Sequence, residues 1–134
     1  MELNITAFER AIERLQEGLA RYRLDESDTQ IRDGLIQRFE FTWELAHKTL
    51  KRYLEQASAD PDAVDAMPFQ EIIRSANEQG LLRSDWPVWR RYREMRARTS
   101  HTYDERTALL VVEAIPDFIA EACALRDELA SRLA

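Results

Sequence analysis

Three side chains in the C-terminal half of the chain have the types and the spacing needed for phosphate chemistry. Arg96, His101 and Tyr103 follow one another as arginine, four residues, histidine, one residue, tyrosine. The arginine guanidinium is a permanent cation whose fork of donors matches phosphate oxygens. The histidine can take or give a proton near neutral pH, and the tyrosine offers a hydroxyl that can be modified. The first hypothesis is that the three side chains take different roles in one reaction at a phosphate group.

Arg96 lies in the apolar sector of the helix predicted around it. A projection at 100° per residue places it together with Trp89 and Tyr92. An arginine in such a sector needs an anion, because a buried and unpaired charge is strongly destabilising. The anion is either a carboxylate of the same chain, such as Glu40 or Glu44, or the phosphate of a ligand.

His101 projects about 140° away from Arg96 if one helix continues through both residues. The two side chains therefore converge only if the helix ends near Thr99, or if a second subunit supplies the partner. Capping patterns at Thr102 and Asp104 favour a break, with a new helix starting after one of them. His101 then lies in a junction between helices, where a structural role is the alternative to a catalytic one.

The elements that must position these residues are predicted to be helices. The chain has 134 residues with only three glycines and four prolines, and its apolar residues recur at threes and fours. We predict one domain, residues 1–134, built as an all-α, up-and-down bundle of about five helices. The first helix starts after Asn4 and fades by about Leu24, and the second runs from about Thr29 to Ala57. A polar loop, residues 58–66, precedes a short helix ending at Gly80, a fourth helix capped by Ser84, and a fifth with a kink at Pro116.

The second predicted helix is the longest, and its apolar sector is wide. Such a sector predicts contact on more than one side, either with two other helices or with a second subunit. On the opposite stripe, Glu40 and Glu44 stand one turn apart, where like charges are unfavourable unless an arginine meets them. Pairing of these carboxylates with Arg96 is the structural alternative to a phosphate site.

The composition argues against several function classes. A net charge of −6 opposes general nucleic-acid binding. Residues 83–98 carry six arginines against two acids, and they form either a solvated helix face whose arginines pair with acids elsewhere or a local anion-binding surface. A lone Cys123 and two histidines, His47 and His101, argue against a metal site and fit a reducing compartment. The longest apolar run is far too short to cross a bilayer, and no signal peptide is recognisable. We therefore expect a cytoplasmic protein without a membrane partner, metal or cofactor.

Two segments together resemble a known family, the nucleotidyltransferase substrate-binding proteins, a branch of the HEPN superfamily. Residues 31–51 are similar to the long helix of that family, and residues 100–103 to its second signature. The similarity spans nearly the whole chain, including residues 69–82 and 115–116. The resemblance implies an up-and-down helical bundle that forms a homodimer, with a small nucleotidyltransferase encoded alongside as its partner.

The resemblance also implies roles for the motif. Many HEPN relatives are metal-independent ribonucleases, in which an arginine and a histidine four to six residues apart, from each subunit, line a cleft at the dimer interface. Arg96 and His101 match these two positions. In related toxin and antitoxin pairs, the nucleotidyltransferase silences the toxin by adenylylating a tyrosine. Tyr103 occupies the position of that tyrosine in this chain. The family usually has a polar residue, often Asn, directly after the arginine, whereas this chain has Ala97.

Three hypotheses remain open at this point. The first is a toxin-like ribonuclease dimer acting on RNA and controlled by a nucleotidyltransferase, which the intact spacing of Arg96, His101 and Tyr103 favours. The second is a non-catalytic subunit that binds a nucleotide or substrate for that partner, which Ala97 and the net acidity favour. The third is a helical interaction protein in which Arg96 and His101 are purely structural.

Overall fold

Two long helices dominate the fold. The computed structural model describes residues 3–101 and 104–134, with the backbone alone for Ser100 and His101. The described residues form helices and no strand, which confirms the predicted all-α class. The helices are α1 (Thr6–Leu24), α2 (Thr29–Ala57), α3 (Pro61–Asp65), α4 (Phe69–Glu78), α5 (Trp86–His101) and α6 (Glu105–Leu133).

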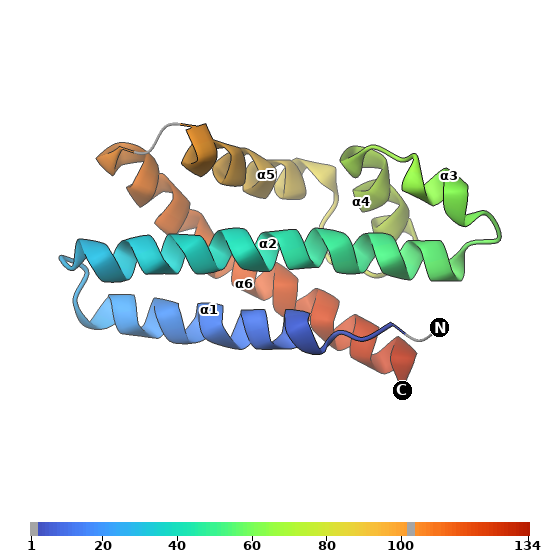
Figure 1. The fold of residues 1–134 in the computed structure, drawn as a ribbon, viewed down its shortest axis with the longest axis horizontal. Coiled ribbons are helices and arrows are strands. Elements are labelled where there is room, and N and C mark those ends of the chain that lie inside the picture. The colour runs from blue at the N-terminus through green and yellow to red at the C-terminus, as the bar shows by residue number, and fades with distance from the viewer. Residues whose placement is uncertain (1–2, 102–103) are drawn as a thin grey trace.

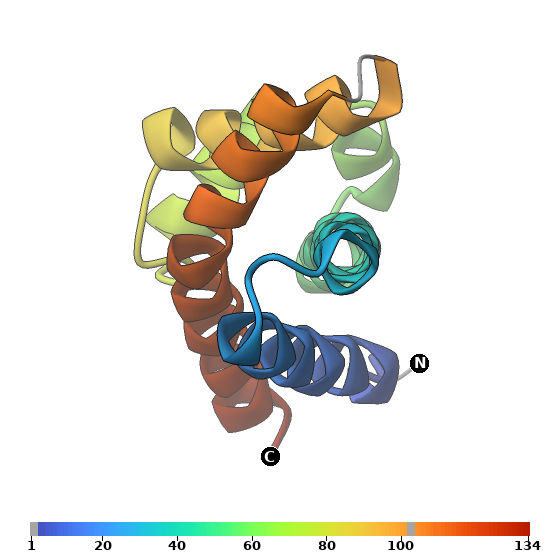
Figure 2. The same ribbon diagram turned by 90° about the vertical axis from the view of Figure 1, so that its left-hand side faces the viewer.

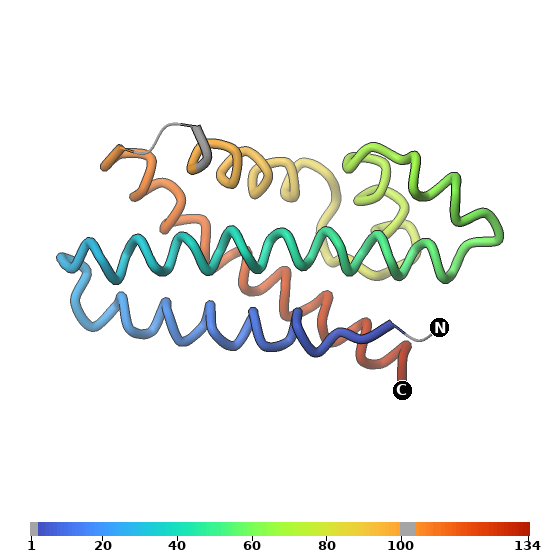
Figure 3. Tube along the Cα trace, in the orientation of Figure 1, coloured from blue at the N-terminus to red at the C-terminus, as the bar shows by residue number. Residues whose placement is uncertain are grey.

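Helix α2 lies at the centre of the bundle. It contacts each of the other helices, whereas α1, α4 and α5 contact only some of the rest. Figure 1 and the trace in Figure 3 show α1 on one side of α2, and α3, α4 and α5 on the other, with α6 crossing behind. Seen end-on in Figure 2, α2 has α1 below it, α5 above it and α6 on one side. The wide apolar sector of α2 is thus used by several helices of its own chain.

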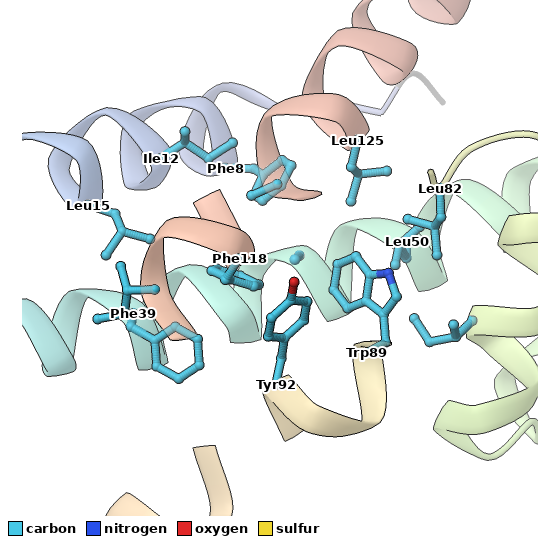
Figure 4. Packing of buried hydrophobic residues seen from close by; sticks show 14 of the residues in the cluster. Phe8, Ile12, Leu15, Phe39, Leu50, Leu82, Trp89, Tyr92, Phe118 and Leu125 are labelled. Carbon is cyan, nitrogen blue, oxygen red and sulfur yellow. The ribbon is translucent and has the colours of Figure 1, made fainter. Parts of the chain in front are cut away.

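An aromatic cluster forms the middle of the core between α2, α5 and α6. The ring of Phe118 packs edge to face against Phe39, at 5.1 Å between centroids, and against Tyr92, at 5.2 Å. Figure 4 shows Phe118 among these rings, with Trp89 beyond Tyr92. Such rings each bury a large apolar area and prefer edge-to-face contacts. The cluster therefore holds α5, which carries Arg96, against both long helices.

Acidic caps start several of these helices. Asp28 accepts hydrogen bonds from the amides of Gln30 and Ile31 at the start of α2, at 3.0 and 3.1 Å. Asp104 accepts from the amide of Thr107 at 2.8 Å and is the N-cap of α6. Each cap accepts hydrogen bonds from amides that have no partner within the helix. This explains why an acidic residue stands directly before each of these helices. Of the two caps predicted for the last helix, Asp104 is the one used.

Three details of the sequence prediction were wrong. The bundle has six helices in its described part rather than five, because residues 61–65 form α3 inside the predicted polar loop. Asp60 caps that helix and Pro61 occupies its first turn, so the signal was present in a very short segment. Ser84 does not cap α5, since its hydroxyl instead donates to the carboxylate of Glu121 in α6. His101 does not lie in the junction between helices as predicted, because it is the last residue of α5.

The turn after α4 follows the prediction for Gly80. Gly80 has a φ of +76°, a conformation that favours glycine. The amides of Gly80 and Leu81 donate back to the carbonyls of Asn77 and Ala76, which is the Schellman arrangement. Pro116 lies within the single helix α6. Within residues 3–101 and 104–134, no helix is both long enough and apolar enough to cross a membrane.

Candidate functional site

Arg96 meets two carboxylates from the central helix. Its Nη1 lies 3.3 Å from Oε2 of Glu40, and its Nη2 lies 2.5 Å from Oε1 of Glu44. The two glutamates are one turn apart on α2, so both can face the same guanidinium from one side. Glu40 and Glu44, which were predicted as alternative partners, therefore both pair with Arg96. The positive charge of this arginine offsets the like charges of the two glutamates.

The Arg96 side chain is half-buried. Its exposed fraction is 24%, against 26% for Glu40 and 44% for Glu44. Ion pairs that remain open to water contribute only about 0–1 kcal/mol to stability. The two carboxylates hold the guanidinium in position, and part of the Arg96 side chain remains exposed to water.

A second arginine on α2 was missed by the sequence analysis. Arg32 is buried at 6% exposure, and its Nη1 lies 2.5 Å from Oε1 of Glu105 in the first turn of α6. It also contacts the neighbouring Asp33. The signal was its place on the apolar stripe, three and four residues before Leu35 and Ile36, which is the same argument that singled out Arg96. Arg32 ties the start of α6 to α2, next to the segment between α5 and α6.

The remaining motif residues lie at the end of α5 and beyond it. His101 is the last residue of α5, so the helix does not break between Arg96 and His101. Ala97, which follows Arg96, is exposed. Tyr103 lies outside the described residues.

Comparison with known proteins identifies the family of this chain. The family model described as "Nucleotidyltransferase substrate binding protein like" matches residues 3–131. The chain belongs to this family. It is 42% identical over 99 residues, 74% of this chain and 67% of the other, to a Haemophilus influenzae protein named "Probable ribonuclease HepT".

A solved structure is similar to this member of the family over almost its whole length. It is that of HI0074 from Haemophilus influenzae, whose title describes the fold of a substrate binding domain of a nucleotidyltransferase. The TM-score is 0.87 at 33% sequence identity, and the match covers 95% of this chain and 99% of the other. The helical fold is therefore shared with HI0074.

An aromatic and cationic patch lies beside α4 in this family member. The ring of His47 packs between Phe69, at 4.4 Å between centroids, and Trp43, at 5.6 Å. The guanidinium of Arg93 lies 5.9 Å from the centre of the Phe69 ring. Burial lowers the pKa of His47, and the nearby charges of Lys51, Arg93 and Lys48 lower it further. The surroundings of His47 thus favour its neutral form.

The described residues offer no ready metal centre. No group of three or more His, Cys, Asp or Glu side chains gathers within residues 3–101 and 104–134 in a way that would hold a metal ion. The carboxylates of the site, Glu40 and Glu44, are instead directed to Arg96. The described part of the site is thus a guanidinium held by two carboxylates.

Proposed function

We propose that this chain is the ribonuclease subunit of a two-component system, in which two copies form the active enzyme and a small nucleotidyltransferase is its regulator. Arg96 and His101 are the catalytic residues of this proposal, and Tyr103 is the residue that the nucleotidyltransferase adenylylates. The observation that carries it is the placement of Arg96, a half-buried guanidinium held by Glu40 and Glu44 on the helix that ends at His101. The similarity to a protein named as a ribonuclease supports it.

The proposed reaction needs one base and one cation. His101 removes the proton of a ribose 2′-hydroxyl, and the oxygen attacks the adjacent phosphorus. The bond from phosphorus to the 5′-oxygen of the next nucleotide breaks, and that oxygen takes a proton from water. The products are a 2′,3′-cyclic phosphate and a 5′-hydroxyl. Arg96 stabilises the negative charge that grows on the phosphoryl oxygens.

The continuity of α5 favours a site made by two subunits. Arg96 and His101 were predicted to meet either across a helix break or across a dimer, and α5 has no break before His101. A symmetric pair of chains, each supplying both residues, satisfies the second condition. The proposed ribonuclease is therefore a homodimer with its clefts between the subunits.

Adenylylation of Tyr103 is the proposed off switch. The transfer joins the tyrosine oxygen to the α-phosphorus of ATP, and pyrophosphate leaves. The product carries a negative phosphodiester and a bulky base two residues after His101, where both charge and volume oppose the binding of RNA. The switch acts by local charge repulsion and by steric exclusion of RNA, so it does not require the bundle to refold.

A non-catalytic substrate-binding subunit is the second candidate. Ala97 stands where the family usually has a polar residue, and Arg96 already has two carboxylate partners. In this case the same guanidinium binds the phosphate of a nucleotide that the nucleotidyltransferase uses. The two candidates differ in whether RNA is cut.

RNA cleavage by purified variants tests the proposed catalysis. We expect Arg96→Ala and His101→Ala to lower the cleavage rate by about 100-fold or more, because each removes a group that acts on the transition state. Arg90→Ala is the matched control, since Arg90 is an exposed arginine of the same helix that pairs with Glu94. Cleavage that survives both substitutions, or that never occurs with the unsubstituted protein, contradicts the ribonuclease proposal.

Intact-mass analysis tests the switch. The protein is incubated with its nucleotidyltransferase and ATP, and we expect a gain of adenylyl mass that Tyr103→Phe abolishes and Tyr53→Phe retains. The modified protein should lose RNA cleavage in proportion to the modified fraction. A gain of mass that persists in Tyr103→Phe assigns the modification to another residue and removes Tyr103 from the proposal.

A further inference from the structure

The aromatic and cationic patch beside α4 has no part in the reaction proposed above. It combines residues of three helices, namely Trp43 and His47 of α2, Phe69 of α4, and Trp86 and Arg93 of α5. Figure 1 shows α4 and α5 on the same side of α2, with the start of α5 next to α4. We refer to these residues together as the patch.

The ring of Phe69 lies at the centre of the patch. It is 8% exposed, and it packs against the rings of Trp43, at 5.3 Å between centroids, His47, at 4.4 Å, and Trp86, at 5.9 Å. These three surrounding residues are partly exposed. Aromatic side chains that reach the surface together offer apolar rings against which a nucleobase can stack.

Arg93 differs from its neighbours on α5 in what it contacts. Arg90, Arg91 and Arg96 form ion pairs with carboxylates. Arg93 is exposed, and no carboxylate in the described part of the chain pairs with its guanidinium. The guanidinium lies instead 5.9 Å from the centre of the Phe69 ring. Its donors are therefore not used by an acidic side chain, and a guanidinium plane is a surface on which bases stack.

The charge around the patch is positive, although the chain as a whole has a net charge of −6. Burial lowers the pKa of His47, and the charges that lower it further come from Lys51, Arg93 and Lys48. Lys51 also pairs with Asp65 at 2.8 Å, whereas Lys48 is exposed. Aromatic rings and positive charge together match a single strand of RNA, because such a strand presents unstacked bases and phosphates side by side.

The patch lies about one helical turn from the Arg96 site on both helices. Arg93 precedes Arg96 by three residues on α5, and His47 follows Glu44, a partner of Arg96, by three residues on α2. Three residues of an α-helix rise about 4.5 Å, and neighbouring nucleotides of a strand are at least about 3.4 Å apart. A strand with its scissile phosphate at Arg96 therefore has its next nucleotide within reach of the patch.

We propose that the patch is a subsite for the nucleotide next to the scissile phosphate, in which Arg93 stacks on the base and donates to its phosphate. The partly exposed rings of His47 and Trp86 border the same base. The subsite selects single-stranded RNA, since the faces of a base in a duplex are covered by its neighbours. The inference deepens the proposed function and rests on it for the scissile phosphate, but binding at the patch can be measured without cleavage.

Binding of an uncleavable strand tests the subsite. The probe is a single-stranded 2′-O-methyl RNA of about ten nucleotides, which lacks the hydroxyl that attacks the phosphorus. We expect Arg93→Ala to raise its dissociation constant about fivefold or more, and to lower the slope of log affinity against log salt by about one. Arg90→Ala is the matched control, because it removes the same charge from an exposed arginine of α5 that pairs with Glu94, and it should bind as the wild type does.

A second variant separates stacking from charge. Arg93→Lys keeps the positive charge but loses the flat guanidinium, so we expect the salt slope of the wild type together with a dissociation constant about threefold or more higher. Arg93→Ala should also weaken the binding of the single strand more than that of the matching 2′-O-methyl duplex. Arg93→Lys that binds as tightly as the wild type, or equal losses for strand and duplex, overturns the stacking role.

Cleavage kinetics on the same variants distinguish failure of the subsite from failure of the proposed function. Where RNA is cut, we expect Arg93→Ala to raise KM about fivefold or more with kcat nearly unchanged, because Arg93 does not touch the reacting atoms. If Arg93→Ala weakens binding of the uncleavable strand while no sample cuts RNA, the subsite is supported, and only the ribonuclease proposal is contradicted.

Three results overturn the subsite. The first is a wild-type protein that does not bind the single strand, and the second is an Arg93→Ala protein that binds and cuts RNA as the wild type does. The third is an Arg93→Ala protein that binds RNA normally but binds the nucleotidyltransferase more weakly, since the patch then belongs to a contact between proteins.

Discussion

At the scale of single residues, two arginines on the inner side of helices connect the parts of the site. Arg32 joins α2 to the start of α6 through Glu105, and Arg96 joins α5 to α2 through Glu40 and Glu44. The first is buried and the second half-buried. Because desolvation makes a buried ion pair costly to break, we assign Arg32 to structure, and we keep the more exposed Arg96 as the residue that acts on the ligand in the proposed function.

A double-mutant cycle measures the coupling energy between Arg96 and its partner Glu44. We expect the coupling between Arg96→Ala and Glu44→Gln to be about 0.5–1 kcal/mol of unfolding free energy, because both side chains are partly exposed to water. Urea denaturation of the wild type, the two single variants and the double variant gives the value. A coupling of several kcal/mol would instead identify the pair as a purely structural contact.

His47 makes stability depend on pH in a defined direction. Its pKa is lowered in the folded protein, first by burial and then by Lys51, Arg93 and Lys48, from an ordinary value of 6.5. The unfolded chain therefore takes up a proton that the folded chain resists, and stability falls as the pH drops below about 6.5. We expect His47→Gln to lose less stability than the wild type between about pH 7.5 and about pH 5.5. Equal losses in urea denaturation would contradict the assignment.

At the scale of elements, the turn between α4 and α5 is held to α6 by one buried carboxylate. Glu121 is 2% exposed, and its Oε1 accepts a hydrogen bond from Nε of Arg83, at 3.1 Å, and another from the hydroxyl of Ser84. The same carboxylate and that of Asp117 contribute, after burial, to raising the pKa of Tyr92 in the core. Glu121 thus sets where α5 begins relative to α6, and with it the position of Arg96.

Removing that carboxylate should loosen the turn. We expect Glu121→Ala to lower the unfolding free energy by about 2–3 kcal/mol, since it leaves a cavity and removes the acceptor of two hydrogen bonds. Glu128→Ala, at a more exposed glutamate of the same helix that pairs with Arg132, should cost no more than about 0.5 kcal/mol. Similar losses in urea denaturation for the two variants would show that the turn does not depend on Glu121.

At the scale of the whole molecule, α2 serves both the fold and the proposed site. Its apolar side packs against the other helices, and its glutamates hold Arg96 on α5. In the proposed homodimer, each cleft takes Arg96 from one chain and His101 from the other. Activity would then be a property of the dimer.

Mixing two inactive variants tests that property. Arg96→Ala and His101→Ala chains are denatured together, refolded and assayed for RNA cleavage. We expect about a quarter of the wild-type rate to return, because half of the dimers are mixed and one of the two clefts in each is complete. Each variant refolded alone is the control. If the mixture is as inactive as its components, arginine and histidine act within one chain, and the shared cleft is wrong.

The local pattern of residues was enough to predict most of the helices. The periodic apolar residues and the predicted cap Asp104 indicated where α1, α2 and α6 lie, because capping and periodicity act within a few residues of the chain. The five-residue helix α3 was missed, since so short a segment shows no period. Continuation of α5 to His101 was missed because competing caps beyond it suggested an earlier end.

The sequence by itself determined that Arg96 needs an anion, that Glu40 and Glu44 were candidates, and that the chain resembles the family to which it belongs. Only the tertiary structure decided that both glutamates meet Arg96, that Arg32 holds α6, and that Glu121 receives Ser84. These contacts join residues that are 37 to 73 positions apart. The side of a helix that a residue occupies follows from local spacing, but the helix that lies opposite follows from how the whole core packs.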